Sequence, residues 1–215
     1  MVGGIEKVYE INRNFRNEGV STRHNPEFTM LEFYTAHKDY HYSMDFVEEM
    51  IKKVVQAICG TLTVPFADKV INFDNFQRLS PYQAVVRYGG LSEADLVDDV
   101  IDVTCKKHNV ACGNISYYQK IFNLFEACAE SKLVDPVFIV DFPIEISPLA
   151  KRDHNNPDIA ARFELFIAGM EISNGFNELN DPFDQAHRFK QQALAHESGD
   201  EEAMHYDKEY ITALE

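Results

Sequence analysis

Two segments near the start of the chain alternate polar and apolar side chains with the period of a β-strand. These segments are residues 9–16 and 28–34, and the stretch between them, 17–26, is rich in residues that form turns. The pattern predicts an antiparallel hairpin with a long loop. The polar side of the first strand consists of Glu10, Asn12, Asn14 and Arg16, and the second strand places Phe28, Met30, Glu32 and Tyr34 on one side.

The middle of the chain has helical signals. After the hairpin, apolar residues recur at three-four spacing, Ser43 is the expected N-cap, and the run ends near Gly60. We expect this helix to cover a sheet. From about residue 78 to residue 132 the signals are again helical, beginning with Pro81 at a first helical position. We interpret this second stretch as a helical insert.

Strand-like sequence returns in the second half of the chain. Residues 136–143 are apolar enough for a strand covered on both faces, and residues 162–179 also have β-type sequence. Pro182 then opens a helix that runs to about residue 196. The chain therefore contains both strand-like and helical stretches.

Charge and cysteine spacing exclude several function classes. The chain has 20 Lys and Arg against 35 Asp and Glu, a net charge of −15 that argues against a stand-alone nucleic-acid binder. Its four cysteines form no C-x-x-C pair, which argues against a zinc ribbon or a thioredoxin-type site. Apolar runs fall far short of the roughly 20 residues of a membrane span, and we see no secretion signal. We therefore expect a cytoplasmic protein.

The predicted hairpin carries a first candidate site. Arg16 on the strand faces a loop with Arg23 and His24, and guanidinium groups bind phosphate oxygens in pairs. The ring of Phe28 shares its side of the strand with Glu32 and Tyr34, an arrangement that suits a nucleotide base beside a cationic ligand. A hairpin with a surface Arg–Glu pair and a core phenylalanine is the alternative interpretation.

A second candidate site lies in residues 162–178. If Ala168-Gly169 form a tight turn, Phe166 lies opposite Glu171, and Glu164 becomes the diagonal neighbour of Glu171 with Cβ atoms roughly 7 Å apart. Two such carboxylates can share magnesium, which fills its other sites with water and phosphate oxygens. Asn174 and Glu178 have the opposite parity to Glu171, and a bulge or turn at Asn174-Gly175 would bring them inward. Solvated acids on a hairpin are the alternative.

Residues 10–19 and 23–32 closely resemble the second signature motif of class II aminoacyl-tRNA synthetases in its lysyl form. Residues 171–181 resemble the downstream lysine-pocket segment of the same family, and the helical stretch resembles the insert between its motifs. The resemblance covers essentially the whole chain. It implies an α+β fold, with an antiparallel sheet flanked by helices. The chain would be a partial catalytic domain over residues 1–215, with the helical insert at about 78–132.

The resemblance also implies a role for each matching residue. The implied reaction joins lysine to ATP as lysyl-adenylate, with magnesium as cofactor, and then transfers lysine to tRNA(Lys), by an enzyme that is a homodimer in its full-length form. Arg16 would hold the α-phosphate and the lysine carboxylate, Glu18 the adenine amino group, Arg23 and His24 the distal phosphates, and Phe28 would stack on adenine. Glu32 would bind the α-amino group, Tyr34 and Glu178 the ε-ammonium and Asn174 the carboxylate; Phe176 would line the lysine pocket, and Glu164 and Glu171 would hold magnesium.

The sequence departs from the family pattern at both ends. We expect the anticodon-binding barrel and first motif to be missing upstream of Met1. The third motif is also expected to be missing, because no glycine follows Gly199 and no arginine follows Arg188. The chain then corresponds to a piece of the catalytic domain with impaired activity. Two alternatives stay open: a lysyl-type ligase that modifies elongation factor P, and a non-catalytic synthetase-like module that binds a nucleotide or a partner.

Overall fold

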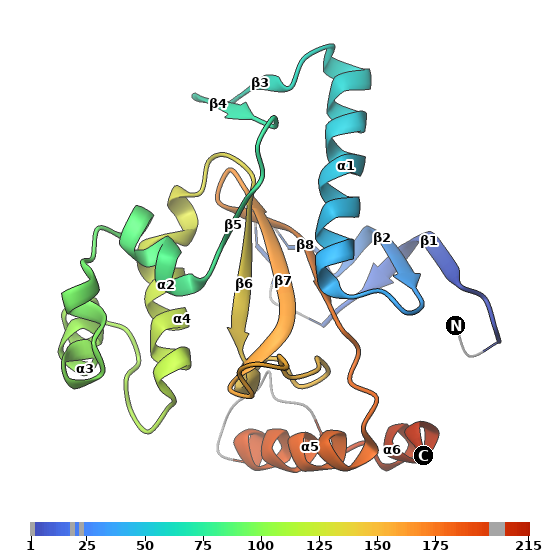
Figure 1. The fold of residues 1–215 in the computed structure, drawn as a ribbon, viewed down its shortest axis with the longest axis vertical. Helices are drawn as coiled ribbons and strands as arrows, with labels where there is room; N and C mark the ends of the chain where they lie inside the picture. The colour runs from blue at the N-terminus through green and yellow to red at the C-terminus, as the bar shows by residue number, and fades with distance from the viewer. Residues whose placement is uncertain (1–2, 18–19, 22–23, 198–204) are drawn as a thin grey trace. The chain divides into compact units, whose positions relative to one another are not determined.

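The computed structural model describes residues 3–17, 20–21, 24–197 and 205–215. The chain forms two compact units, Met1–Asp39 and Tyr40–Glu215. Figure 1 labels the helices and strands of both units.

The first unit is a two-stranded hairpin of β1 (Lys7–Phe15) and β2 (Glu27–Thr35). The strands pair antiparallel in an unbroken register, from Lys7 opposite Thr35 to Phe15 opposite Glu27. The amide of Arg16 then donates to the carbonyl of Pro26 at 2.9 Å, so pairing continues one residue into the loop. The predicted hairpin is confirmed. Its two faces differ, because one exposes apolar side chains: Tyr9, Ile11, Phe15 and Leu31.

The second unit is built around a four-stranded sheet in the order β5–β6–β7–β8. The strands are β5 (Gln77–Leu79), β6 (Val137–Pro143), β7 (Ile159–Ile167) and β8 (Met170–Phe176). The β6–β7 and β7–β8 pairs are antiparallel, as expected, whereas β5 is parallel to β6 at the sheet edge. The edge strand was not predicted, because three residues are too few to show a period. A separate hairpin joins β3 (Thr63–Phe66) and β4 (Lys69–Asn72).

One face of this sheet is covered by α1 (Tyr40–Cys59), which packs on β7 and β8 (Figure 1). The prediction that this helix covers a sheet is confirmed, but the N-cap prediction was wrong. The helix begins at Tyr40, so Ser43 lies within its first turn. Tyr40 and Met44 are buried, whereas Ile58 near the far end is 78% exposed, so only the first half of the helix packs on core residues.

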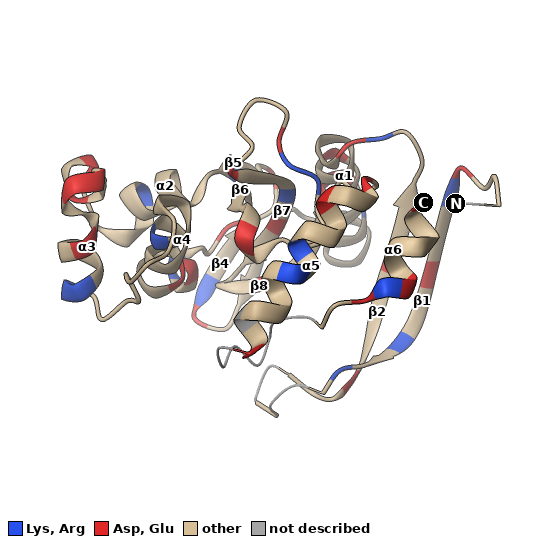
Figure 2. Ribbon diagram, turned by 90° about the horizontal axis from the view of Figure 1, so that it is seen from below, with Lys and Arg blue, Asp and Glu red and all other residues tan. Residues whose placement is uncertain are grey.

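The helical stretch predicted around residues 80–132 is present. It contains α2 (Pro81–Ala84), a π-helical turn η1 (Val85–Gly89), the 3-10 turn η2 (Glu93–Leu96), α3 (Asp98–Lys107), α4 (Tyr117–Cys128) and the 3-10 turn η3 (Glu130–Lys132). Ser80 caps α2 by accepting from the amide of Gln83. Figure 2 shows acidic residues at the start of α3 and lysines at its end, which complements the helix dipole.

The main hydrophobic core lies between this helical stretch and the sheet. The ring of Phe125 on α4 meets Phe166 on β7 edge-on at 5.6 Å, and Phe122 lies 5.3 Å from Phe142 on β6. These aromatic contacts fix α4 against the face of the sheet that also carries Glu164, because residues 164 and 166 point the same way along β7.

The chain ends in α5 (Pro182–Glu197) and α6 (Lys208–Leu214), which pack on each other. The predicted start of α5 at Pro182 is confirmed. A short 3-10 turn, η4 (Ile144–Ile146), connects β6 to the segment below the sheet. Within the described ranges, none of the helices has the length and apolar character needed to cross a membrane.

Candidate functional site

The register of the β1–β2 hairpin places the predicted residues of β2 on one face. Asn14 lies opposite Phe28, Glu10 opposite Glu32, and Tyr34 follows Glu32 at the next position on that face. The carboxylate of Glu32 accepts a hydrogen bond from the side-chain amide (Nδ2) of Asn14 at 3.4 Å and another from the hydroxyl of Tyr34 at 3.3 Å. These contacts orient Glu32, so the face carries a held carboxylate beside an aromatic ring.

Arg16 and His24 lie at the loop end of the hairpin. The guanidinium carbon of Arg16 lies 5.4 Å from the ring centroid of Phe28, within the range of a cation–π contact. The loop is closed locally by Ser21, whose hydroxyl contacts Nδ1 of His24 at 3.1 Å and accepts from the amide of His24 at 3.1 Å. Two further predicted residues, Glu18 and Arg23, lie outside the described residues.

The hairpin also contains the surface pair of the alternative interpretation, but that pair lies on the other face. Arg13 approaches Glu27 at 3.6 Å, with both side chains largely exposed. Arg13 has the opposite parity to Asn14 and Arg16 along the strand. The Arg13–Glu27 ion pair therefore does not involve the side chains of the polar face.

The β7–β8 hairpin turns at Ala168 and Gly169, as predicted. Both residues have positive φ, 54° and 72°, as a two-residue turn of the hairpin type requires. Glycine is needed at position 169, because a Cβ there would lie 3.0 Å from the carbonyl oxygen of Ser131. Phe166 lies opposite Glu171, which confirms the predicted register next to the turn.

A β-bulge then changes the register beyond the turn. Leu165 pairs with Ser173, so Ile172 is the extra residue, and Glu164 pairs with Asn174. The bulge predicted at Asn174-Gly175 was therefore misplaced by two residues. Because an extra residue inverts the facing of everything that follows, Asn174 shares a face with Glu164 and Glu171 instead of opposing them.

Glu164 is a buried carboxylate, only 8% exposed. Burial and, next, repulsion by the carboxylate of Glu171 raise the pKa of Glu164 to about 7, and the nearby Arg162 offsets only part of this effect. This effect of Glu171 agrees with the register, in which Glu171 pairs with Phe166 and Glu164 lies two residues before Phe166 on the same strand. The donor set fits a hard cation, because magnesium uses one or two protein carboxylates and a cation here would restore the charged form of Glu164.

Glu164 and Glu171 alone supply too few ligands for a complete metal site. Over the described part of the chain, no group of three or more His, Cys, Asp or Glu side chains is arranged to hold a metal ion. A cation held by Glu164 and Glu171 would therefore need further oxygen ligands from water or from a phosphate-bearing ligand.

Arg162 is a site residue that the sequence reasoning missed. Its guanidinium pairs with Glu164, donates from Nε to Oδ1 of Asn174 at 3.3 Å, and lies 4.6 Å from the ring centroid of Phe142. The signal was present in the sequence, since Arg162 stands two residues before Glu164 in an otherwise apolar strand and must share its face.

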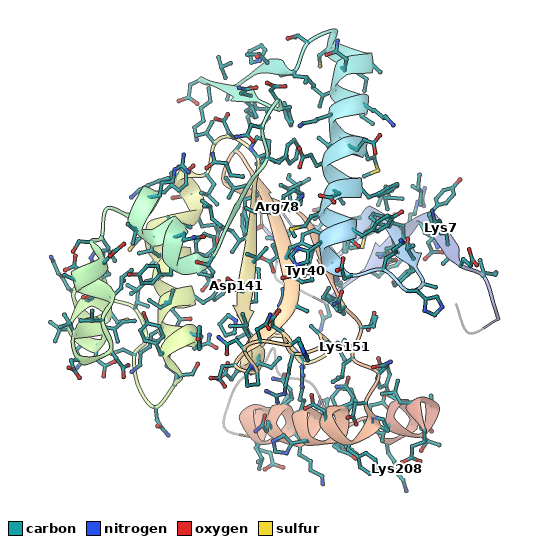
Figure 3. All side chains as sticks on the ribbon, viewed as in Figure 1. Lys7, Tyr40, Arg78, Asp141, Lys151 and Lys208 are labelled. Atoms are coloured by element: carbon teal, nitrogen blue, oxygen red, sulfur yellow. The ribbon has the colours of Figure 1, made fainter. Side chains whose placement is uncertain are left out.

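Glu178 follows β8 and is held through its backbone. It pairs with Ala150 in an isolated bridge, the amide of Leu179 donates to Leu149 at 2.9 Å, and the amide of Lys151, labelled in Figure 3, donates to Asn177 at 2.8 Å. Partial burial raises the pKa of the Glu178 carboxyl. Burial and, after it, the charge of Glu178 also raise the pKa of Tyr210, so α6 contributes a phenol to this region.

A second missed arginine holds the segment that pairs with Glu178. Arg188 of α5 is 3% exposed; it pairs with Asp184 at 2.8 Å and donates to the carbonyls of Ser147, at 3.1 Å, and Ala150. Gln185 adds a bond to the carbonyl of Pro148 at 2.9 Å. Helix α5 therefore fixes residues 147–150, and through them the backbone of Glu178.

The predicted site residues thus form two groups, one in each compact unit. The first unit brings together Arg16, Phe28, Glu32 and Tyr34, with His24 in the adjacent loop. The second brings together Glu164, Glu171, Asn174 and Phe176 on one face, followed by Glu178. Phe176 lies opposite Arg162, so its ring follows the Arg162–Glu164–Asn174 cluster along the strand.

Comparison with known proteins identifies the family. The family described as tRNA synthetases class II (D, K and N) matches residues 1–215. A lysine–tRNA ligase from Ectopseudomonas mendocina (strain ymp) is 50% identical over 219 residues, covering 100% of this chain and 43% of the relative. The lysine–tRNA ligases of Pseudomonas putida (strain W619) and Azoarcus sp. (strain BH72) are 49% and 50% identical, each over 100% of this chain and 44% of the relative. The chain spans less than half the length of these relatives, and it belongs to the class II tRNA synthetases of the D, K and N group.

Proposed function

We propose that this chain is the part of a lysine–tRNA ligase that binds lysine and ATP and forms lysyl-adenylate. The observation that carries the proposal is the bulge-set register of β7 and β8, which gathers Glu164, Glu171 and Asn174 on one face. Sequence identity of about 50% to lysine–tRNA ligases over the whole chain supports lysine as the amino acid.

The resemblance implies acidic lysine contacts in each of the two units. Glu32 is held by Asn14 and Tyr34 and would receive the α-amino group, while Tyr34 and Glu178 would receive the ε-ammonium. Glu178 is exposed, so its carboxylate is accessible to a ligand, and a bound ammonium group would pair with it. A ligand without that ammonium would leave the carboxylate unpaired, which is the physical basis of selectivity.

ATP would bind along the polar face of the hairpin. Phe28 would stack on adenine, Arg16 would neutralise charge at the α-phosphate, and His24 would contact the distal phosphates together with Arg23. Glu18 would accept from the adenine amino group. Attack of the lysine carboxylate on the α-phosphate needs little covalent help from the protein, so positioning and charge neutralisation carry the reaction.

Magnesium is the proposed cofactor, held by Glu164 and Glu171. It would supply neutralisation of the charge on the phosphate oxygens of ATP. The protein's own contribution is the paired carboxylates on one strand face and the arginine that holds Glu164. In the full-length enzyme we further propose tRNA(Lys) as the acceptor, a homodimeric assembly, and a cytoplasmic location, where translation takes place.

Calorimetric titration of the 215-residue chain tests the binding part of this proposal. Lysine should bind, and norleucine, which has the same four-carbon side chain but no ε-ammonium, should bind at least about tenfold more weakly, because the carboxylate of Glu178 loses its partner. Glu178→Gln should abolish the preference for lysine, whereas Glu93→Gln removes an equal charge from the exposed start of η2 and should leave it intact. Equal binding of lysine and norleucine by the wild-type chain would contradict the proposal.

A segment exchange tests the reaction. Residues 1–215 would replace the matching segment of the Pseudomonas putida ligase, to which they are 49% identical along their whole length. We expect lysine-dependent ATP–pyrophosphate exchange by the folded hybrid, with the unmodified ligase as reference. A folded hybrid that binds lysine but catalyses no exchange would refute the assignment of Arg16 and the carboxylate pair to adenylate formation.

A further inference from the structure

Arg162 occupies the centre of the β7–β8 cluster and uses each of its nitrogen atoms. Nη2 binds Glu164, Nε donates to Oδ1 of Asn174 at 3.3 Å, and Nη1 donates to the carbonyl of Ile146 and the hydroxyl of Ser147, both at 3.0 Å. A planar guanidinium with donors on several edges can make these contacts at once, and a lysine ammonium cannot.

Packing also holds the Arg162 side chain in place. The Arg162 side chain is 15% exposed and its guanidinium carbon lies 4.6 Å from the centroid of Phe142. Its hydroxyl acceptor, Ser147, is 3% exposed and is itself held by Arg188 through its carbonyl at 3.1 Å. Arg162 therefore has little freedom to turn away from the strand face that carries Asn174.

The contact with Asn174 determines which way the side-chain amide points. Arginine carries only hydrogen-bond donors, so the amide must present its oxygen to Nε. The Nδ2 donors of Asn174 then point away from Nε of Arg162. Asn174 is exposed, so these donors are available to an acceptor on a ligand. A carboxylate, which has only acceptors when ionised, is the matching group.

We infer that Arg162 is a positioning residue that fixes the amide of Asn174 in the orientation needed to donate to the carboxylate of lysine. The inference rests on the proposed function, because it takes Asn174 as the carboxylate contact. Without Arg162, nothing on this strand face fixes the amide, and the orientation that presents its oxygen to the substrate carboxylate replaces the hydrogen bond with repulsion.

Arg162→Lys is the informative variant, since it keeps the charge and loses the shape. In the 215-residue chain we expect lysine binding to weaken about tenfold by calorimetry, the loss of one charge-assisted hydrogen bond. Cadaverine, which keeps both terminal nitrogens of lysine and lacks the carboxylate, should bind the variant and the wild type equally. A general loss of structure would weaken both ligands together.

A double-mutant cycle tests whether Arg162 acts through Asn174. In an Asn174→Ala background, Arg162→Lys should weaken lysine binding less than about twofold further, because the amide it orients is already gone. Additive losses in this cycle would overturn the inference. The inference would also be overturned if the wild-type chain binds lysine and Arg162→Lys binds it equally well. If the wild-type chain binds no lysine, the proposed function itself is refuted, and the inference with it.

Arg78→Lys is the matched control. Arg78, labelled in Figure 3, stands on β5 of the same sheet, pairs with Asp45 of α1, and lies 5.8 Å from the ring centroid of Phe138. It repeats the chemistry of Arg162, a strand arginine with a carboxylate and a phenylalanine ring, on residues that have no proposed substrate contact. Lysine binding should be unchanged in this variant, and a loss equal to that of Arg162→Lys would contradict a specific role for Arg162.

Discussion

Gly175 separates two proposed lysine contacts, Asn174 and Phe176, and its replacement by alanine tests how tightly β8 is placed. A Cβ at position 175 would lie 2.6 Å from two ring carbons of Phe163, about 0.8 Å inside the 3.4 Å at which ordinary contact begins. The ring cannot retreat, because Phe163 is 2% exposed and packs edge-on against Phe138 at 5.4 Å. The strand must therefore move away from β7.

We expect Gly175→Ala to cost about 1–3 kcal/mol of unfolding free energy, the usual range for overpacking a core. For a chain of this size each kcal/mol lowers Tm by roughly 2–4 °C. Displacement of the flanking residues should also weaken lysine binding about tenfold, equivalent to one hydrogen bond to a charged group. Thermal unfolding followed by circular dichroism and calorimetric titration with lysine measure the two effects.

Two further variants make this experiment decisive. Gly113→Ala is the control, since no atom lies within 4 Å of the position a Cβ would take and φ there is not positive. Phe163→Leu in the Gly175→Ala background removes the ring edge and should restore much of the lysine affinity. If Gly175→Ala is as stable as the wild type and binds lysine equally well, the close packing of β8 on Phe163 does not position the site.

Three other changes have defined outcomes. Burial and the charge of Glu171 raise the pKa of Glu164 to about 7, above the ~4.3 of an unfolded chain, so stability should fall as pH rises from about 4 to 7. In Glu164→Gln, the free energy of unfolding measured by urea titration should depend less on pH across this range. The same pH dependence as in the wild type would contradict the raised pKa of Glu164. Glu178→Gln should greatly weaken lysine-dependent pyrophosphate exchange in the full-length ligase; near-normal exchange would remove Glu178 from the pocket. Arg188→Leu leaves Asp184 without its closest partner and should lower the free energy of unfolding by about 3 kcal/mol, measured by urea titration. A decrease below about 1 kcal/mol would contradict this expectation.

Local periodicity predicted much of the fold. The alternation in residues 9–16 and 28–34 was sufficient for the β1–β2 hairpin, because an unbroken register preserves the facing of every residue. The end of β6 at Pro143 was also predicted correctly, whereas its start was predicted one residue early, at Pro136 instead of Val137. The α1 start was wrong by four residues, because an N-cap at Ser43 would make Met44 the first helical residue, whereas the helix begins at Tyr40, whose side chain is buried.

The candidate site was predicted less completely, because its register depends on one residue. Ala168-Gly169 signalled the turn, and this placed Phe166 opposite Glu171 correctly. Nothing about Ile172 marks a bulge, since isoleucine is an ordinary strand residue. The facing of Asn174 relative to Glu164 therefore could not be predicted from alternation alone, although the need for an irregularity between Glu171 and Glu178 could.

The two arginines were missed for a different reason, which concerns their partners. Arg162 and Arg188 donate to the carbonyls of Ile146, Ser147 and Ala150, and a backbone carbonyl leaves no trace in the side-chain pattern. A sequence can place an arginine on a strand face, but it cannot show that a distant loop returns to accept its hydrogen bonds. Because buried donors must be satisfied, an arginine in an apolar strand nevertheless requires such a loop. An isolated arginine in an apolar strand is therefore a useful sign, in sequence alone, of a residue that organises a site.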